Sequence, residues 1–321
     1  LPNNNIVTTS ALNKMNIEHL KEKLYELALS QQLNAQSTYL FNKTFKPDTL
    51  SITSPACLVV DNGYLLAGPY ANNTGVSAFY VRKIDMQGET VWFKSYEESN
   101  YGIYAIGGGI LIEAHIPATY ILAGSLYYEN SNNKDIVLMH FLSDGTPLWT
   151  YYIEQADSIE GVYHITKSSD GGYIMCGIKR SFTDNNRFYV LKVDAMGNKE
   201  WDKVLHEDRH GSAFSVIETN NTFLVSGTIH NLANDYDNYL VWLDLNGNMI
   251  NERFYGTAGN EGGGWVIEYD SSTYILVNGI FNGSSFAQNV VSKLNINGDI
   301  LWQKVHNLNF TINLMGFWGF G

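Results

Sequence analysis

The chain has 321 residues, of which 45% are hydrophobic and only 16% charged, and its 32 acidic and 20 basic residues give a net charge of -12. This composition excludes an intrinsically disordered chain, and no apolar run is long enough for a membrane span. The negative balance and the lack of a basic cluster argue against a nucleic-acid partner.

Residues 1–38 are predicted to form an extended arm followed by an α-helix. Within 16–36, Asn16 is a suitable N-cap, and apolar residues recur at the spacing of one helix face. This face either docks on the rest of the chain or packs on a neighbouring subunit. The next segment, 39–45 (YLFNKTF), has the pattern of the outermost strand of the repeats that follow.

Two motifs recur five times in the rest of the chain. The first is a turn whose glycines are Gly88, Gly145, Gly197, Gly247 and Gly298. The second is an aromatic strand, which precedes each turn glycine by 24 or 25 residues. Because both anchors keep this offset, we predict five repeats, with the bounds 51–97, 98–154, 155–206, 207–256 and 257–306.

Each repeat is predicted to contain four short strands. The turn between the third and fourth strands has Asp first and Gly fourth, as in Asp194 to Gly197, which is typical of a type I turn continued by a left-handed glycine. Apolar residues such as Val190 and Val193 occupy both faces of the third strand. A sheet with one solvated face would alternate apolar with polar residues. The pattern therefore predicts an all-β fold in which five four-stranded blades pack face to face, a β-propeller.

A tryptophan column begins the fourth strands and is expected to fill the space between blades. Its members are Trp92, Trp149, Trp201 and Trp302. Asn251 takes this position in the fourth repeat, so we expect poorer packing there. Residues 310–320 lie where the first strand of another repeat would fall. The propeller domain is therefore predicted over 39–321, and its ring either closes with five blades or includes a partial sixth from 39–45 and 310–320.

Two of these segments also resemble a known group. DGGYIMCG and VDAMGNKEW resemble repeats of secreted bacterial and archaeal propellers, and the Asp-to-Trp segment resembles the tryptophan-docking repeat of the quinoprotein-like superfamily. The resemblance covers about residues 50–306. It is specific for the fold and does not indicate a function. Quinoprotein dehydrogenases have more blades and a vicinal cysteine pair, and this sequence has neither.

Candidate ligand residues precede the first strand of three repeats. Glu160, His210 and Glu261 each come directly before a glycine, and the repeat symmetry would bring them to one end of a central channel. Carboxylate oxygens suit a hard cation such as calcium, and the alternative is a solvated acidic rim. No zinc spacing, nucleophile motif or Ser-His-Asp set can be assigned, so no catalytic residue and no other cofactor is predicted.

These features favour a non-catalytic protein outside the cell or at its surface, acting in assembly or adhesion, for example in a filament. Its partners would be further copies or other surface proteins, bound through the N-terminal helix and the terminal strands. The alternatives are a module that binds carbohydrate or a cation at the channel-end loops, and a hydrolase or quinoprotein-type enzyme. Glycosylation in a suitable host could use the sequons at Asn42, Asn72, Asn220, Asn282 and Asn309.

Overall fold

The computed structural model describes ten stretches of the chain. They are residues 51–52, 56–71, 77–97, 110–127, 134–153, 158–181, 184–231, 235–257, 259–282 and 285–307. All belong to a compact unit of residues 45–321, which is distinct from the unit of residues 1–44. The predicted helix and the terminal strands 39–45 and 310–320 lie outside the described residues, as do Asn42, Asn72 and Asn309.

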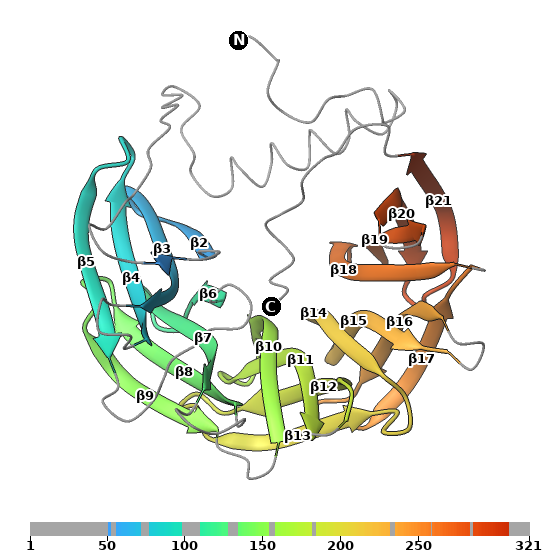
Figure 1. Cartoon of the computed structure of the whole chain (residues 1–321), viewed down its shortest axis with the longest axis horizontal. Helices are drawn as coiled ribbons and strands as arrows, with labels where there is room; N and C mark the ends of the chain where they lie inside the picture. The colour runs from blue at the N-terminus through green and yellow to red at the C-terminus, as the bar shows by residue number, and fades with distance from the viewer. Residues whose placement is uncertain are drawn as a thin grey trace. The chain divides into compact units, whose positions relative to one another are not determined.

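The described residues form five antiparallel blades of four strands, one for each predicted repeat (Figure 1). The blades are β2–β5 (Ala56–Val60, Gly63–Ala71, Ser77–Asp85, Thr90–Glu97), β6–β9 (Ile110–Glu113, Thr119–Tyr127, Lys134–Leu142, Pro147–Ile153), β10–β13 (Ser158–Lys167, Tyr173–Ser181, Arg187–Val193, Lys199–Leu205), β14–β17 (Gly211–Thr219, Thr222–His230, Tyr236–Leu243, Met249–Tyr255) and β18–β21 (Asn260–Asp270, Thr273–Asn282, Ser285–Asn295, Ile300–Asn307). The short strand β1 (Ser51–Ile52) pairs with β3. Within these stretches, no helix has the length and hydropathy needed to cross a membrane.

The first strand of each blade is the innermost one, and neighbouring inner strands contact one another from β2 to β18 (Figure 1). One parallel bridge, between Ile159 and Lys134, also joins β10 to β8. Both faces of the middle blades are buried as predicted. In the third blade, Leu191 packs in a cluster with the second blade, whereas Val190 packs in a cluster with the fourth. The propeller-type fold therefore follows from apolar residues on both faces of each sheet.

The turn between the third and fourth strands has the predicted geometry. In the third blade, Asp194 Oδ1 accepts hydrogen bonds from the backbone N–H groups of Met196 and Asn198, at 2.8 and 2.9 Å. Gly197 then adopts a φ of +87°. This left-handed conformation is unfavourable for a residue with a Cβ atom, so the turn requires glycine.

The turn glycine also leaves room for the tryptophan of the preceding blade. A Cβ atom on Gly197 would lie 2.8 Å from a ring carbon of Trp149. Gly247 has the same relation to Trp201, and Gly145 to Trp92. Each of these three tryptophans therefore packs on the turn of the next blade, and this contact sets how closely two blades approach.

Replacing Gly197 with Ala tests this docking. We expect a loss of about 2–4 kcal/mol in the free energy of unfolding, because backbone strain adds to the clash with Trp149. Gly171→Ala is a matched control, since Gly171 has a φ of +94° but nothing lies within 4 Å of an added Cβ. The control should lose only about 1–2 kcal/mol. Equal losses in urea denaturation would show that the tryptophan contact contributes nothing.

The prediction of poor packing at Asn251 is wrong. Trp242 lies directly across the strand pair from Asn251, and only 5% of its surface is exposed. Its ring approaches Gly298 of the fifth blade as the other tryptophans approach their turn glycines. In the fourth blade the indole therefore comes from the third strand instead of the fourth, and it still fills the gap between blades.

On the fifth blade, the face that carries Val277 is more exposed than the equivalent faces of the other blades. Val277 is 41% exposed, whereas Ala67, Ala123, Cys176 and Ser226, at the same position in the other blades, are at most 1% exposed. Within the described stretches, this face has no blade packed against it. A partial sixth blade stays a prediction.

Candidate functional site

The inner strands have two chemically different ends. The inner strand β10 begins near Glu160 and ends at Lys167. We call the end with Glu160 the acidic end. We call the opposite end the turn end, because the turns from first to second and from third to fourth strand both lie there in an antiparallel meander.

Glu160 is a fully buried acid at the acidic end. Its Oε1 accepts a hydrogen bond of 2.5 Å from Ser158 Oγ and lies 3.8 Å from Lys179 Nζ, while its Oε2 has no hydrogen-bond partner in the described structure. Burial raises the pKa of Glu160 to about 7, and the negative charges of Asp135 and Asp202 act in the same direction. A proton therefore stays on Glu160 close to neutral pH.

A second carboxylate, Asp202, contacts the same lysine. Lys179 Nζ lies 3.5 Å from Asp202 Oδ2, so one ammonium group faces both acids. Asp202 also accepts a hydrogen bond of 3.0 Å from the Tyr189 hydroxyl and lies 3.3 Å from Lys199 Nζ. Two ammonium groups and one phenol hydroxyl therefore contact Asp202. Glu160, Lys179, Tyr189 and Asp202 come one each from the four strands of the third blade.

Glu261 occupies the equivalent position in the fifth blade and is also buried. Its Oε1 accepts hydrogen bonds from Thr257 Oγ1 and N, at 2.5 and 3.1 Å, and its Oε2 has no partner in the described structure. Burial raises the pKa of Glu261, with the charges of Asp237 and Asp235 adding to the effect. Unlike Glu160, it forms no ion pair with a described residue.

The third predicted position, His210, is half-buried and contacts other partners. Its Nε2 lies 2.9 Å from the side-chain amide of Asn185, and its ring centroid is 5.5 Å from that of His230. Among the described residues, no three His, Cys, Asp or Glu side chains are placed to hold a metal ion. The strand register thus makes Glu160 and Glu261 equivalent, but Gly211 and not His210 holds that position in the fourth blade, and the three residues are not gathered into one site. The alternative of a solvated rim is wrong for both glutamates, because both are buried.

Between the two ends, aromatic rings of the inner strands contact one another. Tyr163 stacks on Phe214 with a centroid distance of 5.6 Å, and His164 meets Trp265 edge-on at 5.0 Å. Burial lowers the pKa of His164 to about 4, and its Nδ1 accepts a hydrogen bond from the Val216 N–H. His164 therefore stays neutral near pH 7 and acts as a packing residue.

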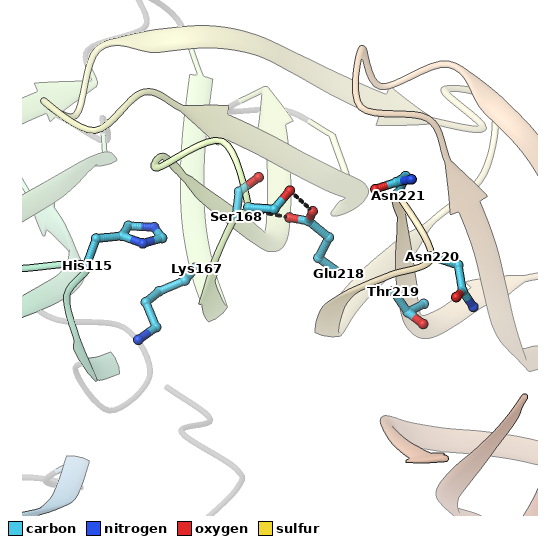
Figure 2. A pocket seen from close by; sticks show the side chains of 8 residues that line it. His115, Lys167, Ser168, Glu218, Thr219, Asn220 and Asn221 are labelled. Atoms are coloured by element: carbon cyan, nitrogen blue, oxygen red, sulfur yellow. Dashed lines mark hydrogen bonds between the residues drawn. The ribbon is translucent and has the colours of Figure 1, made fainter. Parts of the chain in front are cut away.

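The turn end carries a polar pocket with a volume of about 410 Å³ (Figure 2). Its lining comes from turns of the second, third and fourth blades and consists of His115, Lys167, Ser168, Ser169, Glu218, Thr219, Asn220 and Asn221. Glu218 is held by the Ser169 backbone N–H at 2.9 Å and by the Ser169 hydroxyl. His115 Nε2 lies 3.0 Å from the carbonyl of Gly172, which fixes its ring. All of the lining residues are polar or charged.

No family model and no curated protein matches the sequence. Solved structures match in fold. A chimera of apocarotenoid oxygenase and RPE65 has a TM-score of 0.50 at 12% identity, over 81% of this chain and 63% of that one. A Synechocystis apocarotenoid oxygenase mutant has a TM-score of 0.50 at 10% identity, over 82% and 63%. An endo-arabinase from Bacteroides thetaiotaomicron has a TM-score of 0.44 at 10% identity, over 81% and 94%.

These comparisons correct the functional prediction made from sequence. The two apocarotenoid oxygenase structures have this propeller-type fold, which contradicts the expectation that the fold indicates a non-catalytic protein of assembly or adhesion. At such low identity the likeness shows the fold alone, so any reaction has to be argued from the side chains of this chain.

Sequence reasoning identified Glu160 but missed the residues around it. Lys179 and Asp202 carry no motif and come together beside Glu160 only through strand pairing, whereas Ser158 lies two residues earlier on the same strand. The repeat offset could have placed Lys179 opposite Glu160, but it does not predict burial. The raised pKa therefore had no signal in the sequence.

Proposed function

We propose that this protein is an acid–base hydrolase that cleaves glycosidic bonds at the acidic end. Glu160 is the proton donor, and Asp202 is the second carboxylate. The observation that carries the proposal is the buried Glu160, whose pKa is raised to about 7 and whose Oε2 has no partner in the described structure, next to an ion-paired acid.

Glycoside hydrolysis needs two carboxyl groups in different protonation states. Burial supplies the protonated one at Glu160, and Lys179, Lys199 and Tyr189 support the ionised one at Asp202. Oxygens of both acids contact Lys179 Nζ, at 3.8 and 3.5 Å. Because both oxygens contact one nitrogen, they are at most about 7.3 Å apart, below the upper limit of the roughly 5–9.5 Å that separates glycosidase carboxyl pairs.

The roles follow from these states. Glu160 Oε2–H gives its proton to the glycosidic oxygen as the bond from that oxygen to the anomeric carbon breaks. Asp202 accepts a proton from water while the water oxygen bonds to the anomeric carbon. Lys179 contacts both acids and balances the negative charge that forms on Glu160 when its proton leaves.

The direct test is hydrolysis of a panel of aryl glycosides by the whole chain between pH 4 and pH 9. We expect turnover of at least one glycoside, with a rate that falls as the pH rises through about 7, because Glu160 then loses its proton. A panel with no hydrolysis at any pH would contradict the proposal. In that case Glu160 would be a buried structural acid.

Glu160 should also leave a signature in stability. Its pKa rises from an ordinary value of 4.5 to about 7 on folding, so the folded state binds the proton more tightly than the unfolded state. The stabilisation is full below pH 4.5 and is lost as the pH rises through about 7. The free energy of unfolding of Glu160→Gln, measured with urea, should fall less steeply over this range than that of the wild type. Identical slopes would argue against the raised pKa.

We also propose that the repeat of this chain is related to that of the quinoprotein-like propellers. It is supported by the way in which a tryptophan of one blade packs on the turn glycine of the next, as Trp149 does on Gly197. It concerns the origin of the repeat and implies no quinone. Relatives in which this tryptophan and this glycine vary independently would contradict it.

A further inference from the structure

The polar pocket at the turn end brings together side chains from three consecutive blades (Figure 2). His115 comes from the turn between the first and second strands of the second blade. The equivalent turns of the third and fourth blades supply residues 167–169 and 218–221. The volume of about 410 Å³ falls within the roughly 300–1,000 Å³ of small-molecule sites. The hydrolysis proposed at the acidic end does not use this pocket.

The pocket carries one positive and one negative side chain. Lys167 supplies an ammonium group and Glu218 a carboxylate, which Ser169 holds through its backbone N–H at 2.9 Å and through its hydroxyl. An anionic ligand would be repelled by Glu218, and a cationic ligand by Lys167. An uncharged ligand with hydroxyl groups meets neither repulsion. A hydroxyl donates to a carboxylate, and its lone pairs accept from an ammonium group.

Other lining groups add both donors and acceptors. His115 Nε2 donates to the Gly172 carbonyl at 3.0 Å, so Nδ1 of the neutral ring is an acceptor. Ser168 and Thr219 add hydroxyl groups, and their side chains are buried. Ser168 Oγ has no hydrogen-bond partner in the described structure. Buried polar groups normally have such a partner, so a hydroxyl of a ligand would complete this one.

The turn of the fourth blade displays two carboxamides from an unusual backbone conformation. Asn220 and Asn221 have φ angles of +49° and +58°, and in the described stretches no other neighbouring pair of non-glycine residues has positive φ. They form the two-residue turn between Thr219 and Thr222, which pair across the hairpin. Such turns favour glycine at the second position, because a Cβ atom is crowded there. Asn221 therefore keeps a carboxamide at the pocket where glycine would suit the backbone better.

From these observations we propose that the pocket at the turn end binds a small uncharged saccharide. Sugar hydroxyls donate to Glu218 and accept from Lys167, and the carboxamide of Asn221 both donates and accepts. This site is additional to the hydrolytic site and does not depend on it. Its contacts are hydrogen bonds formed beside water, so we expect weak binding, with a Kd of about 1 mM.

A ligand-observed NMR titration of the whole chain with monosaccharides tests the proposal. The probes are glucose, galactose and mannose, which contain no glycosidic bond and therefore report binding without hydrolysis. We expect at least one of them to bind. Its uronic acid and its amino sugar have the same ring but carry a charge, and each should bind at least about fivefold more weakly.

Two charge variants make the test specific for this pocket. Glu218→Gln should bind the uronic acid at least about fivefold more tightly than the wild type does, because the like charge is gone. Lys167→Gln should do the same for the amino sugar. A purely structural role of either side chain would not produce these opposite shifts.

A turn variant tests the contribution of the carboxamide. Asn221→Gly removes it while the backbone conformation becomes easier to adopt, and should weaken sugar binding about fivefold. Asn62→Gly is the matched control, since Asn62 has a φ of +59° in the corresponding turn of the first blade and does not line the pocket. This control should bind like the wild type. Thermal unfolding of every variant checks that the fold is kept.

A wild type that binds none of the three sugars overturns the proposal, and so does an Asn221→Gly variant that binds as well as the wild type. Tighter binding of a charged sugar than of its neutral parent would show an ion site instead. Glu160→Gln should bind the sugar like the wild type although it should lose hydrolysis. Failure of one of the two proposals is therefore distinguishable from failure of the other.

Discussion

Replacing Glu160 with Gln is expected to lower kcat for glycoside hydrolysis by about 10²–10⁴-fold, the usual contribution of a general acid. Gln has nearly the same shape and still accepts the hydrogen bond from Ser158, so the blade should stay folded. What it cannot do is give a proton to the leaving oxygen. The rate that remains should no longer fall as the pH rises through about 7, because the group with that pKa is gone.

Glu261→Gln is the matched control for this measurement. Glu261 is the equivalent residue of the fifth blade, is buried, and also has an Oε2 without a partner in the described structure. It forms no ion pair with a described residue and has no lysine that links it to a second acid. We expect this variant to keep wild-type kcat. Equal losses in both variants would indicate a general structural effect, and a fully active Glu160→Gln would exclude Glu160 as the acid.

Replacing Trp242 with Ala is expected to lower the free energy of unfolding by about 3–5 kcal/mol. Trp242 is almost fully buried and belongs to the apolar cluster that joins the fourth and fifth blades. Removing the indole opens a cavity at an interface where Asn251 cannot fill the space. Urea denaturation measures the loss. Asn251→Ala is the control and should cost about 1 kcal/mol or less, because Asn251 is half-buried and polar.

A double variant tests directly whether Trp242 replaces the tryptophan that is missing at Asn251. In the second blade, Trp149 lies opposite His140, whose Nε2 is 2.7 Å from Thr119 Oγ1. Thr222 of the fourth blade makes the same turn contact as Thr119, each through Oγ1 to a carbonyl three residues earlier. Trp242→His with Asn251→Trp would copy the second blade. It should recover much of the stability that Trp242→His alone loses, and a double variant no more stable than that single variant would contradict the exchange.

The repeat itself could be predicted from the sequence, because it depends on local spacing. Turn chemistry such as Asp194 to Gly197 needs only neighbouring residues, and the constant offset between aromatic strand and turn glycine implies one structural unit per copy. Apolar residues on both faces, such as Val190 and Val193, then require that each sheet is covered twice. The four strands per blade and the propeller-type fold were accessible on these grounds.

The site depended on contacts that sequence spacing does not encode. Glu160 was identified only as one of three equivalent acidic or basic positions, and nothing in the pattern distinguished it from Glu261. Lys179 reaches it through strand register and contacts Asp202 with the same ammonium group, and the burial of Glu160 is visible only in the folded chain. For the same reason, the sequence did not show that Trp242 takes the place of the tryptophan missing at Asn251. The two residues are neighbours only across a strand pair.

Local chemistry therefore determined the blades, since turns and alternating side chains act within a few residues. Tertiary structure alone decided which carboxyl group holds a proton at neutral pH, because a pKa depends on the charges and the water that surround a group in space.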